Sequence, residues 1–124
     1  MERYVAAARR GDFETAFGHF AEDIVFRIPG RSRFAGERRG REAAMDYIDE
    51  ARALSREHEI EVEVVDALVS EERFSLVVVE RFHLDGEVVE IPRSNVYRVR
   101  GEEIVEIWIF EGDQYAADAL MAGV

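Results

Sequence analysis

The sequence predicts an α+β fold, in which about three N-terminal helices pack on the concave face of a curved antiparallel sheet and a short helix closes the C-terminus. The apolar residues of the first half follow a helical period, whereas those of the second half alternate or form long runs between turn residues. A chain of 124 residues has the length of one domain. We therefore expect residues 1–124 to form a single domain.

The first helices are predicted from their ends as well as their periodicity. Residues 1–10 form the first predicted helix, which Gly11 ends, and Asp12 is a suitable N-cap for a second one. Apolar residues of the second helix share one face at the spacing i, i+3, i+4, i+7, and these are Phe13, Ala16, Phe17 and Phe20.

A short strand and a third helix follow. The strand covers residues 23–28, and Pro29-Gly30 stops it. Residues 29–41 are predicted to be a polar, arginine-rich loop. The third helix covers residues 41–54, because its apolar residues again fall on one face.

The second half of the chain is predicted to be a meander of strands. Residues 59–64 alternate strictly between apolar and charged residues, which is typical of a strand with one buried face. Asp85-Gly86 favours a two-residue hairpin between its flanking strands. The strands are 59–64, 74–84, 88–100 and 104–110, and a short helix over 113–122 begins at Asp113.

The strand 88–100 carries polar residues on a face that is otherwise apolar. That face consists of Val89, Ile91, Arg93, Asn95, Tyr97 and Val99. A buried polar group needs a partner. Arg93 therefore either pairs with Glu80 across the hairpin or anchors a ligand, and the sequence leaves both alternatives open.

Composition excludes several classes of function. The chain contains no cysteine and no lysine, which removes disulfides, thiolate chemistry and Schiff bases. A net charge of −11 disfavours nucleic acid and anionic membranes as partners. No apolar run reaches the roughly 18 residues of a membrane span. We expect a cytoplasmic protein that uses no metal and no cofactor.

Several segments resemble the SnoaL-like and ketosteroid isomerase-like proteins of the nuclear transport factor 2-like superfamily. They include Gly11-Asp12-Phe13, Phe20-Ala21-Glu22-Asp23, Pro29-Gly30, Gly40-Arg41-Glu42-Ala43, and Ile104 to Trp108 running into Asp113. The resemblance covers nearly the whole chain. It implies a cone of sheet and helices around one pocket. Members of this superfamily isomerise, cyclise, dehydrate, open epoxides or only bind ligands.

The catalytic residues of the ketosteroid isomerases are only partly present. Their general-base aspartate corresponds to Ile28, which cannot accept a proton. Tyr4 matches the tyrosine of their oxyanion hole, and Asn95 stands where they have a carboxylic acid. The resemblance therefore does not imply steroid isomerisation by that mechanism.

The chain also resembles two other branches of the superfamily in part. Both carboxylates of the epoxide hydrolases are absent, because His83 and Phe110 occupy their positions. That resemblance would turn His83 into the pocket, whereas the hairpin register would turn Glu80 inward. The sequence alone does not decide between these two faces. SnoaL-like cyclases have an acid–base aspartate near the last helix, which Asp113 resembles.

These comparisons give a set of expected site residues. We expect catalytic roles for Asp113 and His83, and a ligand-binding pocket formed by Tyr4, Phe26, Arg93, Asn95, Tyr97 and Trp108. The expected function is a cofactor-free isomerase, cyclase or lyase acting on a small apolar carbonyl or hydroxyl compound. The alternative is a non-catalytic ligand-binding or dimerisation module of the same fold.

The sheet is also expected to form an interface. If the inward faces are as assigned, the convex face offers Val96, Ile107 and Ile109. Exposed apolar patches of this kind usually mark interfaces. We therefore expect a homodimer that forms through the sheet.

Overall fold

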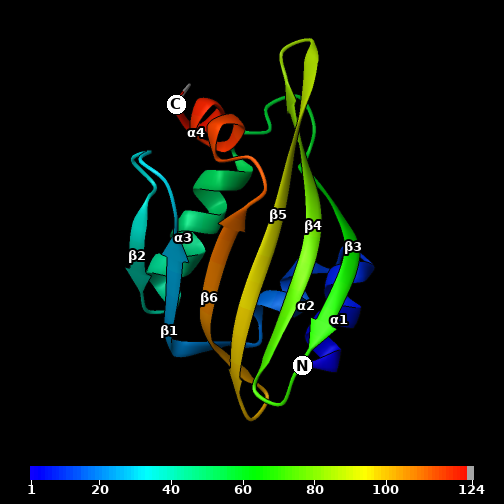
Figure 1. Ribbon diagram of the computed structural model, residues 1–124, viewed down its shortest axis with the longest axis vertical. Coiled ribbons are helices and arrows are strands. Elements are labelled where there is room, and N and C mark those ends of the chain that lie inside the picture. The colour runs from blue at the N-terminus through cyan, green and yellow to red at the C-terminus, as the bar shows by residue number, and fades with distance from the viewer. Residues whose placement is uncertain (123–124) are drawn as a thin grey trace.

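A six-stranded sheet with helices on one face forms the core of the protein (Figure 1). The computed structural model describes residues 1–122. The helices are α1 (Glu2–Arg9), α2 (Phe13–Phe17), α3 (Arg41–Arg52) and α4 (Gln114–Ala122). The strands are β1 (Phe20–Ile28), β2 (Gly36–Arg39), β3 (Glu61–Val69), β4 (Arg73–Leu84), β5 (Glu87–Arg100) and β6 (Glu103–Glu111).

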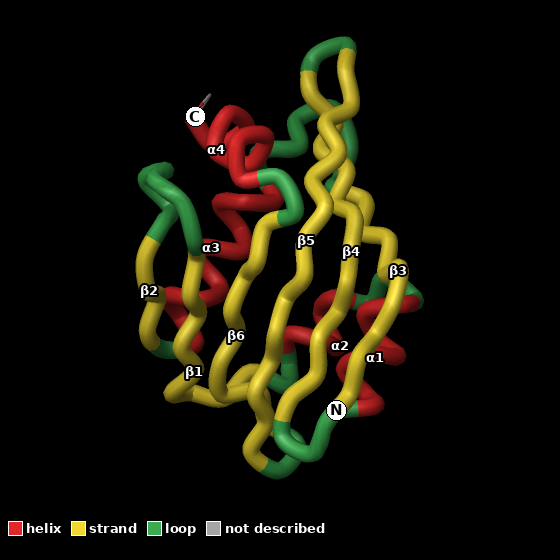
Figure 2. Tube along the Cα trace, viewed as in Figure 1, coloured by secondary structure: helices red, strands yellow, loops and turns green. Residues whose placement is uncertain are grey.

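The predicted α+β architecture is confirmed. The strands lie in the order β2-β1-β6-β5-β4-β3, and α1, α2 and α3 lie behind the sheet in the view of Figure 2. All neighbouring strands are antiparallel except β1 and β6, which are parallel. After β1 the chain forms β2 on one edge of it, continues through α3, builds β3, β4 and β5, and returns with β6 to the other edge of β1, where the two strands are parallel. No helix among residues 1–122 is long and apolar enough to cross a membrane.

The beginning of α2 agrees with the sequence prediction, and its end does not. The Asp12 side chain accepts a hydrogen bond from the Thr15 backbone N–H, as an N-cap does. The helix ends at Phe17, and Phe20 is the first residue of β1. The rings of Phe17 and Phe20 are 5.4 Å apart, so the apolar face continues from the helix into the strand without a helical turn.

The loop predicted for residues 29–41 contains a strand. Residues 36–39 form β2 and pair antiparallel with β1, with Gly36 opposite Ile28. The sequence Gly-Glu-Arg-Arg carries no apolar alternation, so no periodicity predicted it. Arg27 of β1 instead forms an ion pair with Glu37 at 2.5 Å, which helps to hold this edge strand.

The hairpin between β4 and β5 decides which face of β4 points inward. Leu84 pairs with Glu87, and Gly86 has a φ of +80°, as the predicted two-residue turn requires. Glu80 consequently lies opposite Ile91. The inward residues are Phe74, Leu76, Val78, Glu80 and Phe82. The hairpin register is therefore correct, and the alternative derived from the epoxide hydrolases is wrong.

A β-bulge reverses the faces that the sequence predicted for β6. Val99 pairs with Ile104 but Arg98 pairs with Glu106, so Val105 is an extra residue. Beyond the bulge, Ile107 and Ile109 point inward and are buried. The prediction that they lie on the convex face is wrong.

Trp108 and Phe110 occupy the convex face instead. Trp108 is 41% exposed and Phe110 is 48% exposed. Trp108 pairs with Val96, while Tyr97, which lines the inner face, pairs with Ile107. The prediction that Trp108 converges with Tyr97 on one cavity is therefore wrong.

The inward position of Ile107 leads to a prediction for stability. Replacing Ile107 by alanine is expected to lower the free energy of unfolding by about 2–5 kcal/mol, because it empties a buried site. The matched change Val88→Ala on β5 should cost at most about 1 kcal/mol, because that side chain is 51% exposed and lies away from Trp108 and Phe110. Urea unfolding of both variants measures the difference. The reverse order would show that β6 has the opposite facing.

Candidate functional site

A cavity of about 110 Å³ lies between the concave face of the sheet and the helices. A single water needs roughly 10–15 Å³, so the cavity has room for a small organic group. Most of its wall is apolar. Representative wall residues are Phe13 and Phe17 from α2, Ile48 from α3, and Leu76, Phe82 and Ile107 from the sheet.

The polar residues of the cavity come from four elements. Alternation along β5 places Arg93, Asn95 and Tyr97 on the inner face. The β4–β5 hairpin places Glu80 beside them. Tyr4 from α1, together with Tyr47 and Arg52 from α3, completes the set.

Arg93 is the centre of a buried ion cluster. Its Nε donates to Glu111 Oε1 at 2.5 Å and its Nη2 donates to Glu111 Oε2 at 3.1 Å. Its Nη1 donates to Glu80. The predicted pair between Arg93 and Glu80 is therefore present, and Glu111 adds a second carboxylate. Only 5% of Arg93 is exposed.

Sequence reasoning missed Glu111. It lies directly opposite Arg93 in the register of β5 and β6. The bulge at Val105 shifts this register by one residue. Counting pairs outward from the turn at Gly101 without knowledge of the bulge would place Phe110, and not Glu111, opposite Arg93. The glutamate that follows the apolar run of β6 was the only available signal.

The ion cluster shifts the pKa values of Arg93 and Glu111. Burial works against the charge of Arg93, but Glu80 and Glu111 nevertheless hold the pKa of Arg93 above its ordinary value. Burial raises the pKa of Glu111, and the hydrogen bonds from Arg93 oppose this shift only in part. One positive charge thus faces two carboxyl groups in a desolvated site.

The tyrosines of the cavity remain neutral hydroxyl groups. Burial raises the pKa of Tyr97 to about 12 and that of Tyr47 to about 12. Burial also raises the pKa of Tyr4 well above its ordinary value. The rings of Tyr97 and Phe74 stack with centroids 4.6 Å apart, and Tyr4 lies 4.9 Å from Tyr97. Packed in this way, the three hydroxyls are fixed donors and not bases.

Two polar atoms at the cavity lack a partner within the described part of the chain. They are the hydroxyl oxygen of Tyr47 and the Oδ1 atom of Asn95, both of which are buried. Tyr47 itself is only 3% exposed. Buried polar atoms are nearly always hydrogen-bonded in native proteins. These two atoms are therefore candidate contacts for a ligand.

Five of the expected ligand-binding residues lie together. Tyr4, Phe26, Arg93, Asn95 and Tyr97 all line this one cavity. Trp108 does not, because it lies on the opposite face of the sheet. Glu80, which sequence analysis considered only as a partner of Arg93, is the carboxylate that lines the cavity.

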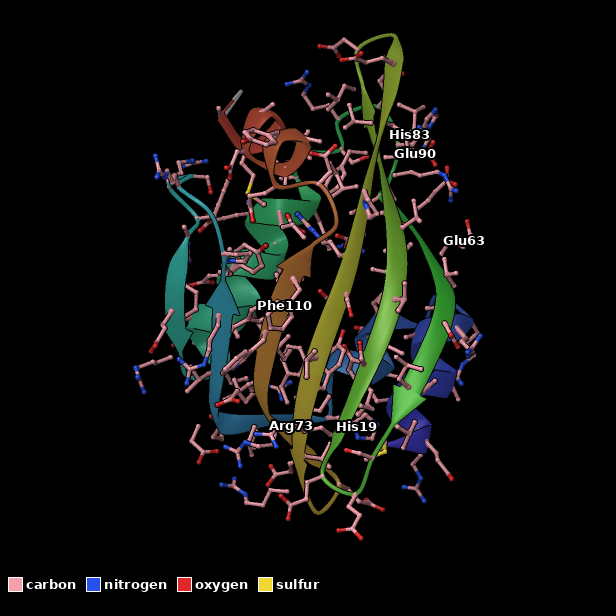
Figure 3. All side chains as sticks on the ribbon, viewed as in Figure 1. His19, Glu63, Arg73, His83, Glu90 and Phe110 are labelled. Carbon is pink, nitrogen blue, oxygen red and sulfur yellow. The ribbon has the colours of Figure 1, made fainter. Side chains whose placement is uncertain are left out.

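The two expected catalytic residues lie elsewhere. His83, labelled in Figure 3, follows the inward-facing Phe82 on β4 and therefore lies on the outer face. Its Nε2 lies 2.7 Å from Glu61 Oε1. Asp113 accepts a hydrogen bond from the Ala116 backbone N–H at 3.0 Å and caps α4. Neither residue is among those that line the cavity. Their catalytic roles stay predictions.

Nothing in residues 1–122 resembles a metal centre, because no group of three or more histidine, aspartate or glutamate side chains is arranged to hold an ion. The polar end of the cavity consists of an ion cluster, hydroxyls and an amide. Such groups suit hydrogen bonding and proton transfer.

The family model for the SnoaL-like domain matches residues 1–107. No curated protein matches the chain. Among solved structures, Bal32a from a soil-derived mobile gene cassette is 23% identical, with 97% of this chain and 92% of that chain covered and a TM-score of 0.82. An NTF2-like protein from Burkholderia xenovorans LB400 is 23% identical, with 97% and 91% covered and a TM-score of 0.68.

A third similar structure is TerC co-crystallised with polyporic acid. It is 12% identical, with 97% of this chain and 93% of that chain covered and a TM-score of 0.77. At these identities, likeness to the solved structures establishes the fold alone.

The raised pKa of Glu111 predicts a pH-dependent contribution to stability. The folded protein holds the proton of the Glu111 carboxyl group more tightly than the unfolded chain does, in which the pKa of this group has its ordinary value of 4.5. The resulting stability is complete below pH 4.5 and is lost as the pH rises through the raised pKa. Glutamine cannot titrate, so the free energy of unfolding of the wild type minus that of Glu111→Gln should fall as pH rises above 4.5.

Urea unfolding of both proteins at several pH values measures this difference. The groups that face Glu111 are Arg93, Glu80 and Asp118, and both proteins retain them. A difference that stays flat or grows with pH would contradict the prediction.

Proposed function

We propose that this chain, which belongs to the SnoaL-like domain family, binds a small apolar carbonyl or hydroxyl compound in its cavity and acts on it as a cofactor-free isomerase, cyclase or lyase. One observation carries the proposal. Among the described residues, Glu80 is the one carboxylate that lines the largely apolar cavity, and tyrosine hydroxyls lie beside it. This combination supplies a proton acceptor and hydrogen-bond donors without a cofactor.

The arrangement divides the chemical roles among the residues. Glu80 is the acid–base group, and Arg93 orients it through a hydrogen bond to one of its oxygens. The hydroxyls of Tyr4 and Tyr97 are neutral, so they can donate to a carbonyl oxygen that gains negative charge during proton abstraction. The apolar walls exclude water, which strengthens these interactions.

The second candidate function is a non-catalytic binding module of the same fold. Its supporting observation is also the pair of Arg93 and Glu80, because a carboxylate held in a partly buried ion pair can have a structural role in place of a catalytic one. The similar structure of TerC was obtained by co-crystallisation with polyporic acid, so at least one protein of this fold was crystallised with a small molecule. In both candidates a small molecule occupies the cavity.

Two matched variants separate catalysis from binding. Ketones that bind are first identified because they raise the melting temperature of the protein. In heavy water, NMR then measures how fast each bound ketone takes up deuterium at the carbon next to its carbonyl, which reports proton abstraction. Glu80→Gln should slow this uptake by about 100-fold or more, because it removes the base. Glu63→Gln should leave the uptake unchanged, since Glu63 is exposed, pairs with Arg81 and does not line the cavity. Ketones that bind but exchange no proton in the wild-type protein would favour the non-catalytic module.

We also propose that the protein forms a homodimer through the convex face of its sheet. Trp108 and Phe110 are adjacent there and half exposed, with ring centroids 6.0 Å apart. The Arg27 guanidinium lies 5.4 Å from the Trp108 ring and borders the patch. Contiguous exposed aromatic groups of this kind usually mark protein interfaces.

Light scattering at micromolar concentration tests the dimer. Phe110→Glu should convert a dimer to a monomer, because it places a charge in the apolar interface. Tyr115→Glu on α4 is the matched control, since Tyr115 is 91% exposed and lies on a different element. A monomeric wild-type protein would contradict the proposal.

A further inference from the structure

The ion cluster at the cavity carries an unbalanced charge. Arg93 uses Nε and Nη2 for Glu111 and Nη1 for Glu80, so both edges of its guanidinium are occupied. The Glu111 side chain is 3% exposed and lies behind Arg93, whereas the Glu80 side chain is 17% exposed and lines the cavity. With both carboxyl groups ionised, the cluster has a net charge of −1.

An anionic ligand would find no counter-charge at this end of the cavity. The guanidinium that could bind a carboxylate or phosphate is already engaged by two carboxylates. The low dielectric of the site strengthens the repulsion between Glu80 and a second negative charge. The cavity therefore disfavours anions for a local reason, separate from the overall charge of the protein.

A cationic group would instead complete the cluster. The rings of Tyr4, Tyr47 and Tyr97 line the cavity, and aromatic faces attract ammonium groups. The buried Oδ1 of Asn95 and the hydroxyl oxygen of Tyr47 lack partners among the described residues and can accept hydrogen bonds. An ammonium group is a donor in all its hydrogen bonds, and it matches these acceptors.

A second arginine, Arg52, also lines the cavity, but it lies away from the cluster and does not supply a counter-charge there. Arg52, in the last turn of α3, borders both the cavity and a neighbouring hollow formed by residues 49–60. Besides Arg52, that hollow contains three acidic residues, Asp49, Glu57 and Glu59, and one further arginine, Arg56. Arg52 thus stands toward the surface, in an environment that already contains carboxylates.

We propose that the cavity selects its ligand by charge, taking a small apolar ring that carries a protonated amine and rejecting the same ring with a carboxylate. The selectivity resides in the excess carboxylate of the cluster formed by Glu80, Arg93 and Glu111. The proposal rests on the cavity being a small-molecule site, as the proposed function requires. It adds the charge of the ligand, which neither the fold nor the family specifies.

Three probes that share a benzene ring and are similar in size test the proposal: benzylamine, benzyl alcohol and benzoate. Titration of each probe into ¹⁵N-labelled protein at neutral pH gives its affinity from the side-chain amide signals of Asn95, which report this site alone. Benzylamine should bind at least about tenfold more tightly than benzoate, and benzyl alcohol should lie between them. Benzoate binding as tightly as benzylamine would overturn the proposal.

Variants locate the source of the selectivity. Glu111→Gln removes the excess charge without altering a residue that lines the cavity, so it should reduce the ratio of amine to carboxylate affinity at least about threefold. Glu80→Gln should reduce the ratio as well, and it keeps the experiment informative if Glu111→Gln folds poorly. An unchanged ratio in both variants would overturn the assignment to the cluster.

The overall charge of −11 needs a matched control, because it attracts amines nonspecifically. Glu63→Gln removes the same charge from an exposed position, where Glu63 pairs with Arg81. This variant should keep the wild-type ratio of amine to carboxylate affinity. The wild-type protein in about 0.5 M salt should keep the same ratio, because salt screens exposed charges much more than buried ones. A ratio lost in salt or in Glu63→Gln would overturn the proposal.

Failure of this proposal and failure of the proposed function give different results. If benzyl alcohol shifts the Asn95 signals but the amine and the carboxylate bind equally, the cavity binds small molecules without charge selection. If none of the probes shifts those signals, both proposals fail together.

Discussion

The ion cluster around Arg93 fixes the geometry on which the cavity depends. A buried guanidinium is costly unless its hydrogen bonds are satisfied, and its partners come from both neighbouring strands. Glu80 belongs to β4 and Glu111 to β6, so Arg93 on β5 joins three adjacent strands. A shift of one residue in either pairing would turn a carboxylate to the opposite face and leave the guanidinium unpaired. The cluster therefore penalises any register other than the observed one.

The sequence predicted those parts of the fold in which local signals agree. Asp85-Gly86 gives both a turn and a register, so the pairing of Glu80 with Ile91 could be counted in advance. The strand β6 differs because its register depends on a bulge at Val105, and valine carries no turn or bulge signal. All residues after the bulge were consequently assigned to the wrong face, including Trp108. Glu111 was missed for the same reason.

The candidate site shows a second limit of sequence reasoning. The resemblance to known families directed attention to positions where those families have acids, such as the positions of Ile28 and His83. In this chain Ile28 is apolar and His83 lies on the outer face of the sheet. The carboxylate that faces the cavity comes from a different position, Glu80. Family resemblance predicts where the cavity is, because the fold forms it, but each chain places its own charged groups within it.

The charge imbalance of the cluster links stability to recognition. Two carboxylates around one guanidinium are less favourable than a balanced pair, and burial adds to this cost, as the raised pKa of Glu111 indicates. The surrounding core offsets the cost through apolar packing, including the stacked rings of Phe74 and Tyr97. A cationic ligand would relieve the repulsion that the folded protein contains without it. The repulsion is relieved only when a cation is bound, so the electrostatic cost of the empty cavity adds to the affinity for a cationic ligand. The same cost separates ligands of opposite charge, because an anion would increase the repulsion.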